Sequence, residues 1–229
     1  MSSPYTERRD GTFVVIGCGS AKRNPNDDSD LADAVWTPEE HDVEVPYWRA
    51  QDLYTSSYFR LKRDYAERMT DWTDRDEDKA WAILSAEYGL VLPDQPIPYY
   101  DTNAKDLPNQ PPSNDAPDTR PDGNPIKNRA DEWAYDVAQN LEAWTQLFAK
   151  NSESESRCQR LLILAGDTHY TGPLRKRGAF NGLANISRTS PGLAVEPEFP
   201  FNEIDAAGIG EQMGWLSETN KRLTEVAQS

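Results

Sequence analysis

Three short, continuous runs of apolar residues constrain the fold of this chain more than any other feature. They occupy residues 12–17, 80–85 and 160–166, and each ends in small or polar residues. A run that stays apolar at successive positions is typical of a strand covered on both faces, because the usual alternation disappears when neither face meets water. Such strands occur in parallel sheets, so the runs predict a parallel sheet with helices on both sides.

The segments between and after these runs carry the periodicity of amphipathic helices. Apolar residues recur at three- and four-residue steps within residues 50–69, 130–148 and 209–226. Strands that alternate with helices form right-handed β–α–β units. We therefore expect an α/β fold of three layers, in which a mostly parallel sheet has helices on both faces.

Two polar stretches interrupt this pattern. Residues 24–47 are acidic and contain three prolines, and residues 102–127 are rich in Pro, Asn and Asp. A length of 229 residues suits one large domain. We expect a single domain over residues 1–229 with these stretches as insertions. The second is longer than an ordinary connection, and we expect a surface insertion there, with a lid over the site as the alternative.

Negative charge dominates the composition. The chain has 39 acidic and 24 basic residues, a net charge of −15. A surface of this sign repels nucleic acid, because phosphate binding requires a basic face. It is also an adaptation to concentrated salt, in which ions screen the repulsion between carboxylates. The dispersed acids and the excess of Arg over Lys favour the second interpretation, which leaves room for a local basic pocket.

Membrane, disulfide and zinc signals are missing from the sequence. No run approaches the roughly 18 apolar residues of a membrane span, and the first residues carry no apolar signal-peptide core. Cys18 and Cys158 give no disulfide framework, and with His41 and His169 they show no zinc-ligand spacing. We expect a cytoplasmic protein without a membrane partner or a metal site, although an all-carboxylate Mg²⁺ site stays open. The cofactor and the oligomeric state are unknown at this point.

A polar cluster follows each apolar run, at the sheet edge where open α/β proteins bind ligands. The first contains Cys18, Gly19, Ser20 and Lys22. Small residues let the backbone approach a ligand, free N–H groups bind anions, and Lys22 adds a positive charge. We expect Gly19, Ser20 and Lys22 to bind a ligand. Cys18 is a candidate nucleophile with Lys22 as its nearby cation; the alternative is a tight turn with an inert cysteine.

The second cluster contains Ser85, Glu87, Tyr88, Asp94 and Asp101. Carboxylates beside hydroxyl groups can transfer protons or hold the hydroxyls of a sugar. We expect Glu87 and Asp101 to be catalytic, and Ser85, Tyr88 and Asp94 to bind the ligand. In the alternative, Glu87 pairs locally and the aromatic residues only pack.

The third cluster begins at Gly166 and includes His169 and Tyr170. We expect Gly166 and Tyr170 to bind the ligand, whereas a lone histidine at a strand end is more often a structural hydrogen-bonding residue than a base. Upstream, Tyr54 and Ser56 precede an apolar helical stripe. We expect both to face the first cluster, although Tyr54 also suits the core.

Four motifs occur in order along the chain. They read C-x-S-x-K at 18–22, L-Y-T-S-x-x-F at 53–59, W-x-I-L-S-A-x-Y-G-L-V-x-P-D at 81–94 and G-I-G-x-Q-x-x-W at 208–215. In these motifs the chain resembles an uncharacterised domain-of-unknown-function family grouped with the YaaA-like (peroxide-stress) proteins. The resemblance implies an α/β fold with a pocket, close to nucleobase and nucleic-acid chemistry. Glu87 departs from the lysine usual in that family, which weakens a phosphate site there.

These features predict an enzyme that acts on a nucleotide, a nucleoside or a nucleic-acid base by glycosidic-bond or group-transfer chemistry. Its partner is then a nucleotide-like small molecule or a nucleic acid. Lys22 and the turn amides would hold phosphate, and Tyr54 or Tyr88 would stack on the base. One alternative is a non-catalytic nucleic-acid-binding or stress-response protein resembling YaaA. Another is a small-molecule-binding or interaction module.

Overall fold

In the computed structural model of the chain, the three apolar runs form neighbouring strands of one sheet. The structure describes residues 4–9, 11–70, 80–151, 158, 160–183, 196–204, 206 and 208–227, and the statements below concern these residues. The sheet has five strands, in the order β4 (Gly89–Val91), β3 (Trp81–Ser85), β1 (Thr12–Gly17), β6 (Arg160–Leu164) and β7 (Pro197–Glu198). All neighbours run parallel except β4, which is antiparallel to β3.

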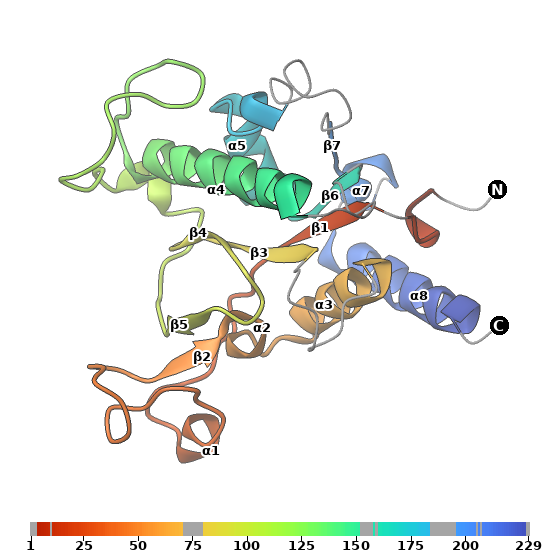
Figure 1. Cartoon of the computed structure of the whole chain (residues 1–229), viewed down its shortest axis with the longest axis horizontal. Coiled ribbons are helices and arrows are strands. Elements are labelled where there is room, and N and C mark those ends of the chain that lie inside the picture. Colours follow the sequence, from red (N-terminus) through yellow and green to blue (C-terminus); the bar gives the residue numbers. More distant parts are fainter. Residues whose placement is uncertain are drawn as a thin grey trace.

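Helices cover both faces of this sheet (Figure 1). One face carries α3 (Ser57–Thr70) and α8 (Ile209–Ala227). The opposite face carries α4 (Arg129–Asn151) and α5 (Gly172–Lys176). Short helical turns connect the elements, namely η1 (Pro4–Thr6), α2 (Ala50–Leu53), η3 (Asp167–Thr171) and α7 (Pro200–Glu203). Among the described helices, none has an apolar stretch long enough to cross a membrane.

The central strand β1 shows why its sequence lacks alternation. Val14 and Ile16 pack into the core beneath α3 and α8, whereas Phe13 and Val15 pack into the core beneath α4. All six residues of β1 are buried. Since both faces of the strand are covered, both sets of side chains are apolar, and the prediction of a three-layer α/β fold with a mostly parallel sheet is confirmed.

The segments that follow β1 and β6 lead away from each other, towards opposite edges of the sheet. From β1 the chain passes through α3 to β3 on one side of β1, and from β3 it passes through α4 to β6 on the other side. The connections that leave β1 and β6 therefore turn towards opposite faces of the sheet. Open α/β sheets bind ligands at such a topological switch point, outside the carboxyl ends of the two diverging strands.

The first insertion is tied to a small second sheet. Residues 24–47 contain the short helix α1 (Asp28–Leu31) and lead into β2 (Tyr47–Arg49), which pairs antiparallel with β5 (Pro96–Pro98). The Trp48 side chain is fully buried, and its indole N–H donates a hydrogen bond of 2.9 Å to the Asp30 carbonyl. This contact fixes the acidic segment against the strand that follows it.

The second insertion lies against α4. It contains η2 (Leu107–Asn109), and the Leu107 side chain is fully buried in the core beneath α4. The Ser113 amide donates to the Glu132 carboxylate at 2.9 Å, and Arg120 donates to Asp131 at 3.1 Å. Residues 102–127 are thus held by two apolar anchors, Ala104 and Leu107, and by charged hydrogen bonds to the start of α4, and none of them lines the pocket described next.

Candidate functional site

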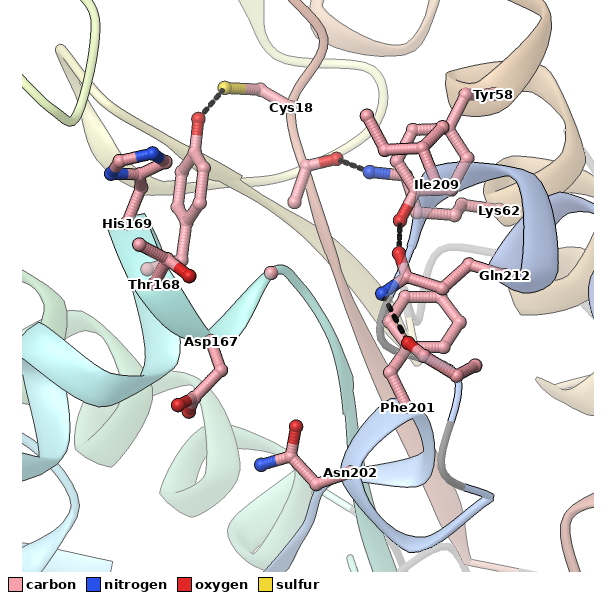
Figure 2. A pocket seen from close by; sticks show the side chains of 14 residues that line it. Cys18, Tyr58, Lys62, Asp167, Thr168, His169, Phe201, Asn202, Ile209 and Gln212 are labelled. Atoms are coloured by element: carbon pink, nitrogen blue, oxygen red, sulfur yellow. Dashed lines mark hydrogen bonds between the residues drawn. The ribbon is translucent and has the colours of Figure 1, made fainter.

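A pocket of about 560 Å³ lies at the switch point, between the carboxyl ends of β1 and β6 (Figure 2). Gly17 and Cys18 line it at the end of β1, and Gly166 begins its second side after β6. Residues of α3, α7 and α8 form the third side. Binding sites for small molecules generally have volumes of about 300–1,000 Å³, so the pocket has the position and the size of a ligand site.

A thiol and a phenol meet across this pocket. The sulfur of Cys18 lies 3.2 Å from the hydroxyl oxygen of Tyr170. Tyr170 belongs to η3, a single π-helical turn directly after β6, and such turns are frequent at functional sites. Burial, reinforced by Cys18, holds the pKa of Tyr170 far above its ordinary value. The hydroxyl therefore keeps its proton and can donate it in a hydrogen bond to the sulfur.

Lys62 contributes a buried amine to the pocket. Its side chain is only 2% exposed, and its Nζ donates a hydrogen bond to the carbonyl of Gly17. The same nitrogen lies 4.4 Å from the centre of the Tyr58 ring, a cation–π contact. Burial lowers the pKa of Lys62 to about 8, although the sulfur of Cys18 opposes the shift. Near neutral pH the pocket thus holds an ammonium group at the end of β1.

An aromatic wall closes the side formed by the helices. The rings of Tyr58 and Phe201 are nearly parallel, with an angle of 29° and centres 6.5 Å apart. Tyr58 donates a hydrogen bond to the side-chain oxygen of Gln212, whose nitrogen donates to the Ala206 carbonyl at 2.9 Å. Gln212 thereby joins α3 to the beginning of α8. Ile209, 62% exposed, lies at the mouth of the pocket.

The side that follows β6 is polar and carries the carboxylate of Asp167. One of its oxygens, Oδ1, accepts hydrogen bonds from Thr171 at 2.9 Å and from Arg175. Desolvation acts to raise the pKa of Asp167, but these two donors, the charge of Arg175 and a hydrogen bond from Asn202 outweigh it and hold the pKa below its ordinary value. Asp167 is therefore ionised at neutral pH. Asn202 lies opposite, with its amide turned towards Asp167 (Figure 2).

A chain of buried hydroxyl groups lies at the carboxyl end of β3. The Tyr54 and Tyr100 oxygens are 2.7 Å apart, and Ser85 donates to Tyr100 at 3.0 Å. The Lys22 amine lies 4.3 Å from the centre of the Tyr100 ring, and burial lowers the pKa of Lys22. Lys22 is thus placed over an aromatic ring, and it is not among the residues that line the pocket.

No cluster of metal ligands is present in the described part of the chain. Among those residues, no three His, Cys, Asp or Glu side chains come together in a way that could hold an ion. The polar groups of the pocket are instead one thiol, one buried amine and one carboxylate, together with hydroxyl, amide and imidazole groups. These groups suit the recognition of an organic ligand.

The model of a family of unknown function, DUF6884, matches residues 46–218. The chain belongs to this family. The DUF6884 match includes Lys62, Asp167, Tyr170 and Gln212, whereas Cys18 lies before its first residue. No curated protein and no solved structure shows a detectable similarity to the chain.

Three of the residues predicted for the site line the pocket, and they are Cys18, Gly166 and Tyr170. A side chain built on Gly166 would have no other atom within 4 Å, which shows how open the pocket is at this point. Two further predicted residues, Tyr54 and Ser85, lie in the neighbouring hydroxyl chain. The carboxyl ends of β1 and β6 therefore meet in one pocket, and that of β3 lies beside it.

Two more predicted residues lie at the start of α3 and in the loop before it. Ser56 accepts a hydrogen bond of 3.1 Å from the Phe59 amide and so caps the helix. A side chain built on Gly19 would come within 3.1 Å of the Ser56 oxygen, so glycine permits this close approach. Ser20 is exposed beside it. Ligand binding by these three residues stays a prediction.

The remaining predicted residues belong to the second polar cluster and do not line the pocket. Glu87 accepts a hydrogen bond from Thr102 and is half-buried. Burial raises the pKa of Tyr88 to about 12. Asp94 and Asp101 are exposed. None of the four lines the pocket, and their catalytic or ligand-binding roles stay predictions.

Several residues that line the pocket are not among the predicted site residues. Lys62 had a recognisable signal, because it occupies the apolar face of α3 between Phe59 and Ala66, where a lysine is unusual. Asp167 directly follows Gly166 in the third cluster. Asn202 belongs to no motif, and only the fold places it at the pocket.

Proposed function

We propose that this chain is an enzyme that acts on a nucleoside, a nucleotide or a nucleic-acid base by glycosidic-bond or group-transfer chemistry. One observation carries the proposal. The Cys18 thiol lies in a pocket of about 560 Å³ at the switch point of the sheet, between an aromatic wall and a carboxylate. Nucleotide-type ligands are typical of this position in open α/β sheets.

The lining of the pocket suits a flat ring attached to a polar group. Tyr58 and Phe201 offer aromatic surface on which a base can stack. Ile209 adds exposed apolar surface at the mouth. On the other side, Asp167 and Asn202 offer a hydrogen-bond acceptor and a donor. This division between apolar and polar sides supports a ligand with both a base and a sugar.

Cys18 is the proposed nucleophile. Burial lowers the pKa of Lys22 and of Lys62, and in both cases the Cys18 sulfur opposes the shift. Both amines therefore lie close enough to the sulfur to interact with it electrostatically, and the sulfur lies open to the pocket. In the proposed reaction the Cys18 sulfur bonds to an electrophilic carbon of the substrate as the bond to the departing group breaks, and the departing group takes up the thiol proton. Water or a second substrate then displaces the sulfur, and the proton that it loses restores the thiol.

The test combines ligand binding with turnover. A panel of bases, nucleosides, nucleotides and short DNA and RNA is screened for a rise in the melting temperature. A ligand at a hundredfold excess over its Kd stabilises the native state by about 2.7 kcal/mol. Ligands that bind are then assayed for conversion by wild type, by Cys18→Ala and by Cys158→Ala, since Cys158 is the second unpaired cysteine and is buried elsewhere.

We expect conversion by wild type and by Cys158→Ala, and none by Cys18→Ala. Equal conversion by all three proteins contradicts the nucleophile. Stabilisation by oligonucleotides alone, unchanged in Cys18→Ala, favours a non-catalytic nucleic-acid-binding protein. A small ligand that binds without any conversion favours a small-molecule-binding module.

We also propose a setting for this activity. The four ordered motifs support a relationship to the YaaA-like proteins. The two unpaired cysteines are compatible with a reducing cytoplasm. The net charge of −15 supports adaptation to concentrated salt.

A further inference from the structure

Most polar groups of the pocket already have a protein partner. The Lys62 amine donates to the Gly17 carbonyl, and the Tyr170 hydroxyl meets the Cys18 sulfur. Gln212 uses its oxygen for Tyr58 and its nitrogen for Ala206. These groups form the walls, so the recognition of a polar ligand falls mainly to the side that follows β6.

Asp167 has hydrogen-bonding capacity on that side. Its hydrogen bonds from Thr171 and Arg175 both go to Oδ1. The Asn202 amide also donates to this carboxylate, whose half-exposed side chain keeps lone pairs that can accept a donor from a ligand. Asn202 faces this carboxylate from α7 with its amide turned towards it (Figure 2). A carboxylate and an amide that face each other can together hold two neighbouring hydroxyl groups, one as a donor and the other as an acceptor.

The carboxylate of Asp167 disfavours a phosphate at its own position. Asp167 is anionic, and its partner Arg175 is not among the described residues that line the pocket. The buried ammonium of Lys62 is already engaged at the end of β1. A ligand that presents neutral donors to Asp167 is therefore favoured over one that presents an anionic group there.

We propose that Asp167 and Asn202 bind the 2′,3′-diol of a ribose, so that the substrate is a ribonucleoside rather than a deoxyribonucleoside. The inference rests on the proposed function, which does not itself distinguish the two sugars. The 2′-hydroxyl donates to the carboxylate of Asp167, and the 3′-hydroxyl accepts from the amide of Asn202. The base then lies towards Tyr58 and Phe201.

The test measures the Kd of the four common ribonucleosides and of their 2′-deoxy counterparts by calorimetry. A hydrogen bond to a charged group corresponds to a factor of about 10 to 100 in affinity. We expect wild type to prefer the ribonucleoside by about this factor. We expect the preference to be lost in Asp167→Asn and reduced in Asn202→Ala. Asp64→Asn is the matched control, because Asp64 is a half-exposed acid of α3 that pairs with Arg68 away from the pocket.

Each outcome of these affinity measurements either supports or overturns the proposed binding of the ribose diol. Equal affinity for both sugars in wild type overturns it and leaves the proposed function intact, because a nucleoside still binds. Failure of every nucleoside to bind overturns both. A preference that survives in the two pocket variants, or that also falls in Asp64→Asn, overturns the roles of Asp167 and Asn202. If Asp167→Asn does not fold, Asn202→Ala decides, since the Asn202 side chain is exposed and tolerates truncation.

Discussion

The ammonium group of Lys62 is enclosed between the end of β1 and the ring of Tyr58. Removing a charged amine from water is unfavourable, and one carbonyl and one aromatic ring replace only part of its hydration. The lowered pKa of about 8 expresses this deficit. A group of this kind weakens the fold while it is charged, so its presence in the pocket points to a role beyond stability.

Lys62 should make stability depend on pH. The unfolded chain keeps this lysine protonated up to about pH 10.5, whereas the folded chain releases the proton near pH 8. Between these values the unfolded state binds more protons, so the free energy of unfolding rises with pH, by up to about 3 kcal/mol from this group. We expect Lys62→Met to lack that rise in urea denaturation between about pH 7 and pH 9.5. Identical pH profiles for the two proteins would contradict the burial of a charged amine.

Tyr170→Phe tests the contact between the phenol and the thiol. The change keeps the ring and removes the hydroxyl that lies 3.2 Å from the Cys18 sulfur. We expect a loss of about 0.5–1.5 kcal/mol in the free energy of unfolding, because one buried hydrogen bond disappears. Tyr99→Phe is the control, since Tyr99 is 41% exposed and should change stability much less. Equal effects of the two substitutions would show that the contact contributes nothing.

At the level of elements, the central strands could be predicted from the sequence and the short edge strands could not. β1, β3 and β6 are buried on both faces, and a strand buried in this way has a continuous apolar sequence that can be recognised. β4 and β5 have three residues each and β7 has two. A run of that length carries too little periodicity to be recognised, and its conformation is set by the strand beside it.

The residues of the candidate site also differ in how far the sequence could predict their positions. Cys18, Gly166 and Tyr170 follow strands that could be recognised, so their meeting at one edge of the sheet could be expected. Tyr58 and Phe201 reach the pocket from helices. The rotation of a helix about its axis and its position over the sheet depend on the packing of the whole core, which no local pattern specifies.

The turn between β3 and β4 requires glycine at position 89. Gly89 has a φ of +68°, and a Cβ there would come within 3.3 Å of the Asn140 side chain. We expect Gly89→Ala to lower the free energy of unfolding by about 1–2 kcal/mol. Gly214→Ala is the control, because its Cβ would meet nothing within 4 Å on the exposed side of α8. That substitution should stabilise the protein by up to about 1 kcal/mol, and a loss there would contradict the assigned helix.

Gln212 links two helices through its amide. Gln212→Ala leaves the Tyr58 hydroxyl and the Ala206 carbonyl without this partner. We expect a loss of about 1–3 kcal/mol in the free energy of unfolding, together with faster amide exchange in the first turn of α8. Gln110→Ala, which truncates an exposed glutamine, should have little effect. Unchanged exchange in α8 would show that the link does not hold the wall together.

For the whole molecule, the net charge of −15 predicts an unusual response to salt. If carboxylate repulsion limits stability, potassium chloride should raise the free energy of unfolding, because at about 1 M the Debye length falls to about 3 Å. Exposed ion pairs such as Arg222–Glu218 are weakened by the same screening. Denaturation in dilute and in concentrated salt decides which effect is larger. A fall in stability with added salt would reject salt adaptation.

The contact between Cys18 and Tyr170 joins residues 152 positions apart in the sequence. During synthesis β1 emerges early, yet its neighbours in the finished sheet include β6, which emerges much later. Until residues 160–212 have left the ribosome, the residues that complete the pocket around Cys18 are absent, and β1 lacks its neighbour β6. For most of its synthesis the nascent chain thus carries the Cys18 thiol without its Tyr170 partner.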